Sequence, residues 1–292
     1  MKKTRTTAFI FFVFRLIPLG VRKILFRSLL MLFYYISPRH RLIAIHNLSR
    51  SFPEKSVSEI ISIAKGSFRH IGIMAAEFFE IPYITKANVH KYVEFDGFEH
   101  IKKALEKKKG VLSILAHFGN WELMSAALPL GAQPVNIIYR PLDSPLVENL
   151  IGWTRTAPGN ALVPKEGSIR KTIRLLAKNQ IMAILIDQNV AVREGIFIDF
   201  FGRPACTGIG LAVLALNTEA PVLPCFMIRM KDGRYKCLLQ PAVEIVKTGD
   251  NEEDIRVNTQ NFNRVIEDIV RQYPDQYFWV HQRWKTRPCQ KE

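Results

Sequence analysis

The chain has 292 residues, of which 41 are Lys or Arg, 26 are Asp or Glu, and 48% are apolar. This composition excludes a largely disordered chain, a collagen-like or coiled-coil protein and a small disulfide-stabilised domain. The length suits one large α/β domain or two small ones with a sizeable core. None of the four cysteines has CxxC spacing or a histidine at zinc-ligand distance, so we expect neither a disulfide framework nor a metal site.

Positive charge is concentrated at the N-terminus, where residues 1–50 carry ten Lys or Arg and no carboxylate. Apolar runs such as FIFFVF (9–14) and LLMLFYYI (29–36) lie between these charges. An arm that binds nucleic acid would keep such faces polar, so anionic membrane lipid is the better partner. We predict an uncleaved membrane anchor over residues 1–38 and a separate domain over residues 39–292.

The form of this anchor is left open by the sequence. A spanning helix needs about 20 predominantly apolar residues, yet four cations and Pro18 interrupt residues 8–36. A charge at the centre of a bilayer costs a few kcal/mol. The segment therefore either tilts across the membrane or lies in the interface of its cytoplasmic side.

The predicted elements follow a strand–helix alternation from Gly110 onward. Two helices (39–52 and 56–79), a short strand (92–95) and a helix (99–109) come first. Short apolar runs then predict strands over 111–116, 135–139, 161–163, 181–186 and 222–228, with 235–239 and 243–246 as a later, partly antiparallel pair. Helices are expected over 121–128, 146–156, 168–178, 207–217 (capped by Thr207) and 253–272. This order predicts an α/β fold with a mixed, mostly parallel sheet flanked by helices.

The six residues HFGNWE, from His117 to Glu122, directly follow a predicted buried strand. Sites form at such strand ends in open α/β sheets. Turn chemistry at Gly119 and Asn120 allows the chain to fold back and aim Glu122 at His117, whose tautomer the carboxylate would fix. The residues alone also suit a structural histidine beside a favourable helix-N-terminal Glu. A metal site has no second His or carboxylate cluster to support it.

HFGNWE resembles the His-x4-Asp/Glu motif of glycerolipid-type acyltransferases, and nearly the whole chain resembles the lipid A late acyltransferases, the lauroyl and myristoyl transferases of lipopolysaccharide biosynthesis. The basic apolar N-terminus is part of this resemblance. The other matching blocks are HNLSRSFPEKS (46–56), YRP (139–141) with the later Arg155, IDQN (186–189), FFGRPACTG (200–208) and YPDQYFWVHQRWKTRP (273–288). Asn189 stands where Asp or Arg is expected in many relatives, so it receives no role.

The resemblance implies transfer of a fatty acyl chain from acyl carrier protein, or coenzyme A, to a hydroxyl of a phosphorylated lipid A precursor. The expected location is the cytoplasmic face of the inner membrane, with residues 39–292 as the catalytic domain and no cofactor beyond the thioester co-substrate. The sequence contains no GxSxG elbow or activated Ser or Cys nucleophile. His117 acting as general base on the acceptor hydroxyl is therefore the simplest scheme.

The predicted site residues fall into two groups. His117 and Glu122 form the catalytic pair. Arg140 and Arg155 suit bidentate phosphate contacts, with surface salt bridges as the alternative. Asp187, at a strand end, is expected to orient a basic residue or the acceptor sugar, with a structural N-cap as the alternative, and Asn120 completes the substrate-binding set.

Three rival functions remain compatible with the sequence. The first is an acyltransferase of the same fold that uses another glycolipid or phospholipid acceptor. The second is a thioesterase, in which water replaces the acceptor hydroxyl. The third is a lipid-binding protein without catalytic activity. Replacement of His117 separates the third from the enzymes, because a binding protein would keep its function.

Overall fold

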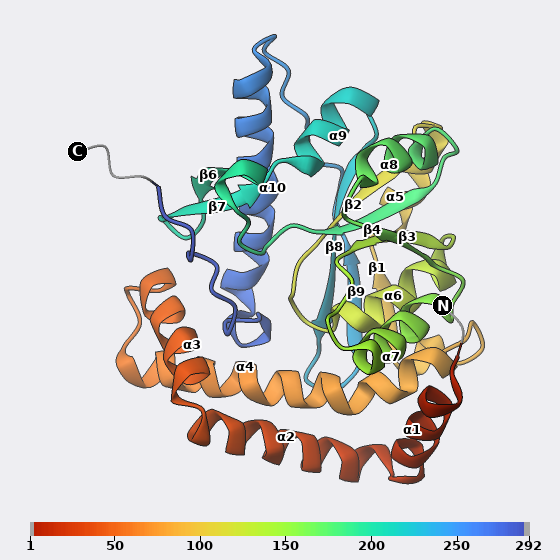
Figure 1. Cartoon of the computed structure of the whole chain (residues 1–292), viewed down its shortest axis with the longest axis vertical. Coiled ribbons are helices and arrows are strands. Elements are labelled where there is room, and N and C mark those ends of the chain that lie inside the picture. Colours follow the sequence, from red (N-terminus) through yellow and green to blue (C-terminus); the bar gives the residue numbers. More distant parts are fainter. Residues whose placement is uncertain (1–2, 289–292) are drawn as a thin grey trace.

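A seven-stranded sheet forms the centre of the molecule (Figure 1). The computed structural model describes residues 3–288. The strands are β1 (Val93–Asp96), β2 (Val111–Leu115), β3 (Val135–Tyr139), β4 (Ala161–Pro164), β5 (Ile181–Leu185), β8 (Val222–Arg229) and β9 (Tyr235–Leu239), in the spatial order β1-β9-β8-β2-β5-β3-β4. Neighbouring strands are parallel except for the antiparallel pair β8 and β9. The predicted mixed, mostly parallel sheet is confirmed.

Strand β2 occupies the middle of the sheet, between β5 and β8, and all its residues are buried. A continuous apolar sequence suits such a strand because helices cover both of its faces. Leu115 at the end of β2 pairs with Leu185 at the end of β5. The register therefore places residues 117 and 187 opposite each other, just beyond the same edge of the sheet.

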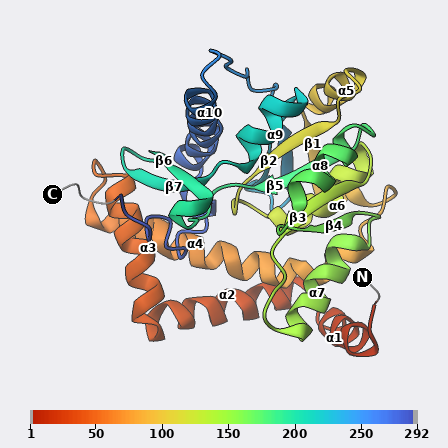
Figure 2. The same cartoon turned by 45° about the horizontal axis from the view of Figure 1, so that its top comes forward.

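Helices cover the two faces and bury two separate apolar clusters. The helices after β1 are α5 (Phe98–Glu106), α6 (Trp121–Gly131), α7 (Pro145–Thr156), α8 (Ser168–Leu176), α9 (Gly210–Thr218) and α10 (Asn251–Gln272). Leu214 of α9 and Ile266 of α10 belong to one cluster, whereas Ile101 of α5 and Leu123 of α6 belong to the other. In both views α9 and α10 lie apart from α6 and α7 (Figures 1 and 2).

Four α-helices precede the sheet in the described residues, namely α1 (Arg5–Leu16), α2 (Leu19–Ile36), α3 (Pro38–Ser51) and α4 (Val57–Glu77), and α2 lies along α4 (Figure 1). Two short 3-10 helices, η1 (Phe78–Tyr83) and η2 (Val89–Lys91), follow them. Pro18 separates α1 from α2, and a capping box between Ser56 and Glu59 starts α4. Within residues 3–288 no helix combines the length and the apolar character needed to cross a bilayer.

Three of the N-terminal cations pair with protein carboxylates, whereas the sequence assigned them to an anionic surface. Arg22 is 1% exposed and pairs with Glu80, and Arg15 lies 3.7 Å from the same carboxylate. Lys23 Nζ lies 2.8 Å from Glu77. Both carboxylates come from the end of α4 and the short turn that follows it, more than 50 residues away, so the local absence of acids did not indicate these pairs.

Two local predictions are wrong. Residues 195–208 form a hairpin of β6 (Gly195–Asp199) and β7 (Pro204–Gly208), and Thr207 lies in β7 instead of capping a helix. The Thr207 hydroxyl accepts a hydrogen bond from the buried Arg283, which accounts for its position. The predicted strand 243–246 is reduced to a single bridge from Val243 to Val222, because β9 pairs with residues 225–229 of β8 and leaves only the start of that edge free.

Candidate active site

His117 and Asp187 meet at the carboxyl edge of β2 and β5. The His117 Nδ1 atom lies 2.9 Å from Asp187 Oδ1, and the backbone amide of His117 donates to Asp187 Oδ2 at 3.0 Å. Asp187 is 2% exposed, whereas 22% of the His117 side chain reaches solvent. A single buried carboxylate thus holds both the ring and the backbone of His117.

The hydrogen bonds define the tautomer of His117. An ionised carboxylate only accepts hydrogen bonds, so Nδ1 carries the proton and Nε2 has the free lone pair. The amide nitrogen of Gln188 lies 3.2 Å from Nε2 and donates to it. A hydroxyl that displaces this amide would find at Nε2 an atom able to take its proton.

The electrostatic surroundings keep Asp187 ionised. Burial raises its pKa, but the hydrogen bonds from the ring and the backbone amide of His117 and the charge of Arg283 oppose it and leave the pKa below its usual range. The Tyr277 hydroxyl also hydrogen-bonds to Asp187, and burial together with the Asp187 charge raises the Tyr277 pKa well above its usual value. Tyr277 is therefore a neutral donor.

The predicted contact between Glu122 and His117 does not form. Glu122 lies in the first turn of α6 and accepts two hydrogen bonds from Arg155 of α7, at 2.9 Å from Nε and 2.6 Å from Nη2. The indole of Trp121 donates to the same carboxylate at 3.1 Å. The turn at Gly119 starts the helix but does not reverse it toward the ring, so Asp187 takes the position expected for Glu122.

The structure also relocates the predicted substrate-binding residues. The guanidinium of Arg155 donates to Glu122. Burial lowers the Arg155 pKa, but the Glu122 carboxylate outweighs this effect and raises the pKa above its usual value. Arg140 is exposed and pairs with Asp143, at 3.4 Å, in the surface salt bridge considered as its alternative. Asn120 is fully buried and caps α6 by accepting from the amide of Leu123. We therefore correct its assignment from substrate binding to a structural cap.

Aromatic side chains enclose the exposed part of His117. Its ring centroid lies 5.2 Å from that of Trp121 and 6.2 Å from that of Phe278. The amide of Phe278 donates to the His117 carbonyl at 3.0 Å. The C-terminal segment, which carries the block YPDQYFWVHQRWKTRP (273–288), thus forms one wall of the site.

A sequence profile described as bacterial lipid A biosynthesis acyltransferase matches residues 4–286. The chain belongs to this family. It is 28% identical over 253 residues to the lipid A biosynthesis lauroyltransferase of Escherichia coli (strain K12), covering 86% of this chain and 80% of that protein. It is 27% identical over 252 residues to the palmitoleoyltransferase of the same strain, with the same coverage. It is 22% identical over 245 residues to the myristoyltransferase, covering 84% of this chain and 75% of that protein.

A buried carboxylate, Glu77, hydrogen-bonds to the HFGNWE loop of this acyltransferase. Its Oε2 atom accepts from Asn120 Nδ2 at 3.1 Å and from the hydroxyl of Tyr235 at 2.6 Å. Its Oε1 atom binds Lys23 of α2. Glu77 therefore connects an N-terminal helix, the outer part of the sheet and the loop that carries His117, a role with no signal in the local sequence.

A narrow apolar pocket lies next to His117 in the acyltransferase. Its cavity volume is about 20 Å³, room for about one water molecule, and it extends between α6 and the sheet. Its lining is Leu115, Trp121, Met124, Ser125, Leu128, Val135, Ile137, Arg155, Ala183 and Leu185. Because Trp121 contacts both the His117 ring and this pocket, the pocket and the proposed base lie side by side.

We expect His70 to make the acyltransferase sensitive to acid. Burial, the largest cause, and the charge of Arg229 lower its pKa to about 4, against a hydrogen bond to Gly119 that raises it. The histidine of the unfolded state takes up a proton near pH 6.5, whereas the folded state does so only near pH 4. The contribution of His70 to the free energy of unfolding is therefore unchanged above pH 6.5 and falls by about 3 kcal/mol as the pH is lowered toward 4. Urea unfolding of wild type and His70→Gln across this range measures the difference, and parallel pH curves would contradict the prediction.

Sequence reasoning missed Gln188, Tyr277 and Phe278 as neighbours of His117. Gln188 follows Asp187 at the end of β5, and the rule that sites form at parallel strand ends applies to it as well. Phe278 and Tyr277 had no such signal, because no regular element of the sheet carries them.

Proposed function

We propose that the chain transfers a fatty acyl group from a thioester of acyl carrier protein, or coenzyme A, to a hydroxyl of a phosphorylated lipid A precursor. The single observation that carries this proposal is the contact of His117 Nδ1 with the buried Asp187, which leaves Nε2 facing the amide of Gln188 beside an apolar pocket. Membership of the lipid A acyltransferase family supports the acyl-transfer chemistry and the class of acceptor.

The proposed reaction needs only one proton acceptor. His117 Nε2 takes the proton of the acceptor hydroxyl while its oxygen forms a bond to the thioester carbonyl carbon. The carbon–sulfur bond then breaks, and the imidazolium returns the proton to the thiolate. Asp187 stabilises the transient imidazolium, as the carboxylate of a catalytic triad does. General-base assistance of this kind contributes about 10²–10⁴-fold to a rate.

The apolar pocket is the proposed entry site for the acyl chain of the donor, and the side chains that line it must move apart to admit the chain. Its lining contains mostly apolar side chains, and its polar groups, Ser125 and Arg155, are few. Ser125 donates to the Glu122 carbonyl and Arg155 pairs with Glu122. Glu122 would therefore act by holding α6 against α7, which keeps this pocket and Trp121 in place.

The N-terminal helices support membrane contact, because α2 exposes its apolar side chains and buries a charge. Ile24 is 64% exposed and Leu29 is 58% exposed, whereas Arg22 is buried. The other exposed apolar side chains of α1 and α2 include Phe9, Phe12, Leu16, Leu25, Leu32 and Ile36. Contiguous apolar patches of this kind mark membrane or protein contacts. We propose that residues 1–38 lie in the interface of the cytoplasmic face of the inner membrane.

Net charge supports the choice of donor. The formal charge of +15 would attract an acidic carrier protein and raise the rate of encounter. A comparison of carrier-bound and coenzyme A thioesters with equal acyl chains tests this choice. Equal kcat/KM for the two donors would remove the support for the carrier protein.

Mass spectrometry provides the test of the proposed function. A phosphorylated lipid A precursor is incubated with the protein and a mixture of acyl-carrier-protein thioesters, with His117→Ala as the control. We expect a mass increase of one acyl chain with wild type and a rate at least about 10²-fold lower with the variant. Release of free fatty acid in place of transfer would instead indicate a thioesterase, and an intact donor would overturn the proposal.

A further inference from the structure

Three segments from distant parts of the sequence pack together: the Phe52 ring after α3 lies 5.3 Å from the Phe201 ring at the β6–β7 turn, and Arg203 of that turn lies over Trp284 of the C-terminal segment. Figures 1 and 2 show these segments on one side of the molecule, and each carries an arginine whose charge acts on the others' neighbourhood. Arg50 lies in the last turn of α3, Arg203 lies at the hairpin turn, and Arg287 lies near the end of the described chain. Burial is the main cause that lowers the pKa of His46, one turn before Arg50, and the charges of all three arginines lower it further. These four residues are here called the basic cluster.

No carboxylate compensates the basic cluster within residues 3–288. The charges that shift the pKa values of His46 and Arg203, besides burial, are all positive. The nearby Glu267 accepts from the amide of Phe201 and pairs with Arg271. Like charges held together without a counter-charge repel one another, so the cluster favours an anion.

Arg203 is held in place before any ligand arrives. Its guanidinium lies 4.5 Å from the ring centroid of Trp284. The Arg203 Nη1 and Trp284 Nε1 atoms are shielded from solvent and have no acceptor among the described residues. Both atoms are donors, so each of them can take an acceptor oxygen. A buried polar atom without a partner in a native structure commonly marks an absent water or ion.

A short chain of contacts connects the surroundings of His117 to the C-terminal segment that carries Arg287. Asn189 donates to the hydroxyl of Thr286 at 2.9 Å and accepts from its amide at 3.1 Å. Asn189 directly follows Gln188, whose amide contacts His117 Nε2, and Thr286 directly precedes Arg287. The C-terminal segment therefore runs from the wall of the active site to the cluster.

We propose that Arg50, Arg203 and Arg287 bind a phosphate group of the acceptor, a phosphomonoester on the glycolipid whose hydroxyl reacts at His117. Guanidinium groups suit phosphate because their fork of donors matches two of its oxygens. This inference rests on the proposed function. It assigns the phosphate to these three arginines and not to Arg155, because the guanidinium of Arg155 already donates two hydrogen bonds to Glu122.

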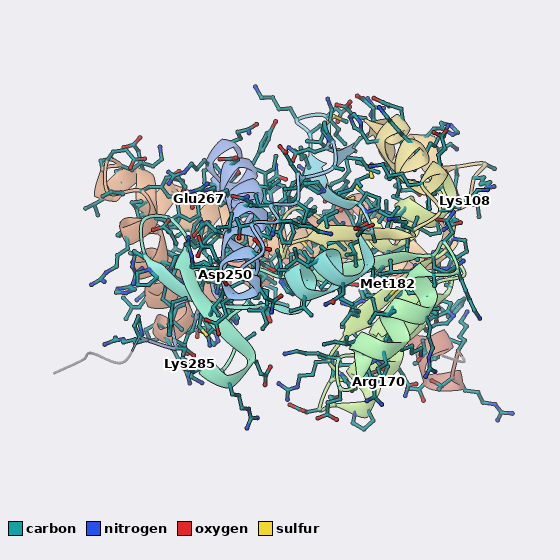
Figure 3. The ribbon with its side chains drawn as sticks, turned by 90° about the horizontal axis from the view of Figure 1, so that it is seen from above. Lys108, Arg170, Met182, Asp250, Glu267 and Lys285 are labelled. Carbon is teal, nitrogen blue, oxygen red and sulfur yellow. The ribbon has the colours of Figure 1, made fainter. Side chains whose placement is uncertain are left out.

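Binding is tested first without catalysis. Histidine labelled with ¹³C at Cε1 reports on His46 while N-acetylglucosamine 1-phosphate or unphosphorylated N-acetylglucosamine is added. We expect a saturable shift of the His46 signal with the phosphorylated sugar only, and its loss in Arg50→Gln/Arg287→Gln. Arg170→Gln, an exposed arginine on α8, is the control and retains the shift. Figure 3 shows Arg170 far from Lys285, two residues before Arg287. An unsaturable shift, or an equal shift in the double variant, overturns the proposal.

Kinetics then identify the source of the phosphate. The double variant should raise KM for the phosphorylated precursor by about 10–100-fold, with kcat nearly unchanged, because charge-assisted hydrogen bonds are lost. The precursor stripped of that phosphate should have the same high KM with both proteins. A change confined to the KM of the carrier thioester, or to binding of phosphatidylglycerol vesicles, overturns the proposal. If wild type binds the phosphorylated sugar but acylates no precursor, the anion-binding site is supported and the proposed function is rejected.

Discussion

Asp187→Asn is expected to lower kcat by about 10³–10⁴-fold while leaving the fold intact. An amide at this position donates hydrogen bonds as well as accepting them, so it no longer requires Nδ1 of His117 to carry the proton. The ring then adopts the tautomer with the proton on Nε2, which cannot accept the proton of the acceptor hydroxyl. A loss of similar size follows this substitution in serine proteases, where the carboxylate has the same relation to the histidine.

The double variant His117→Ala/Asp187→Asn separates this mechanism from a general loss of structure. If Asp187 acts through the His117 ring, the double variant should be no slower than His117→Ala alone. Losses that multiply would contradict the mechanism. Glu122→Gln is a second comparison, because Glu122 contacts Arg155 and not the ring. We expect Glu122→Gln to lower the thermal stability. When it is combined with Asp187→Asn, the two losses of activity should multiply, since the two carboxylates act on different groups.

Gly119→Ala is expected to be the most damaging small substitution in the chain, with about 4 kcal/mol lost from the free energy of unfolding and at least about 10²-fold from kcat. Gly119 has a φ of +57°, and a Cβ atom there would lie 1.7 Å from the Met227 carbonyl oxygen. That carbonyl accepts the amide of Asn120, and the Gly119 amide donates to Gln276. The loop cannot move aside without breaking these bonds and displacing His117.

Gly210→Ala is the matched control for this prediction. Gly210 begins α9 and has no positive φ, and a Cβ atom added there would meet no heavy atom within 4 Å. Alanine should therefore be neutral or slightly stabilising there, by less than about 1 kcal/mol. Denaturant unfolding and kcat of both variants provide the measurement. Gly119→Ala with the stability and kcat of wild type would show that the loop is not held as described.

Local pattern determined much of the fold. The apolar run over residues 111–116 and its counterpart over 181–186 predicted β2 and β5 nearly to the residue, because short continuous apolar runs suit strands buried on both faces. The β6–β7 hairpin was missed, since a helix-like apolar sequence follows it directly and Thr207 resembled a cap. Its hydroxyl was instead needed by Arg283, more than 70 residues later in the chain.

The sequence predicted the position of the candidate site, but it did not predict which carboxylate contacts His117. The sequence alone determined that His117 and Asp187 lie at strand ends, and that the chain resembles lipid A acyltransferases. Only the tertiary structure decided that Asp187 and not Glu122 meets the histidine, because that choice depends on the register between β2 and β5. The pairing of Glu122 with Arg155 likewise depends on the packing of α6 against α7.

The N-terminal helices show the same division between local and long-range information. The sequence alone determined that residues 1–50 are basic and apolar without a carboxylate. Only the tertiary structure decided that Arg22 and Lys23 face inward, because their partners Glu80 and Glu77 lie beyond that stretch. Helix propensity and hydrophobic patterning depend on residues that are close together in the chain, so the sequence indicates them directly. Ion pairs and strand register join residues that only folding brings together, so no local pattern records them.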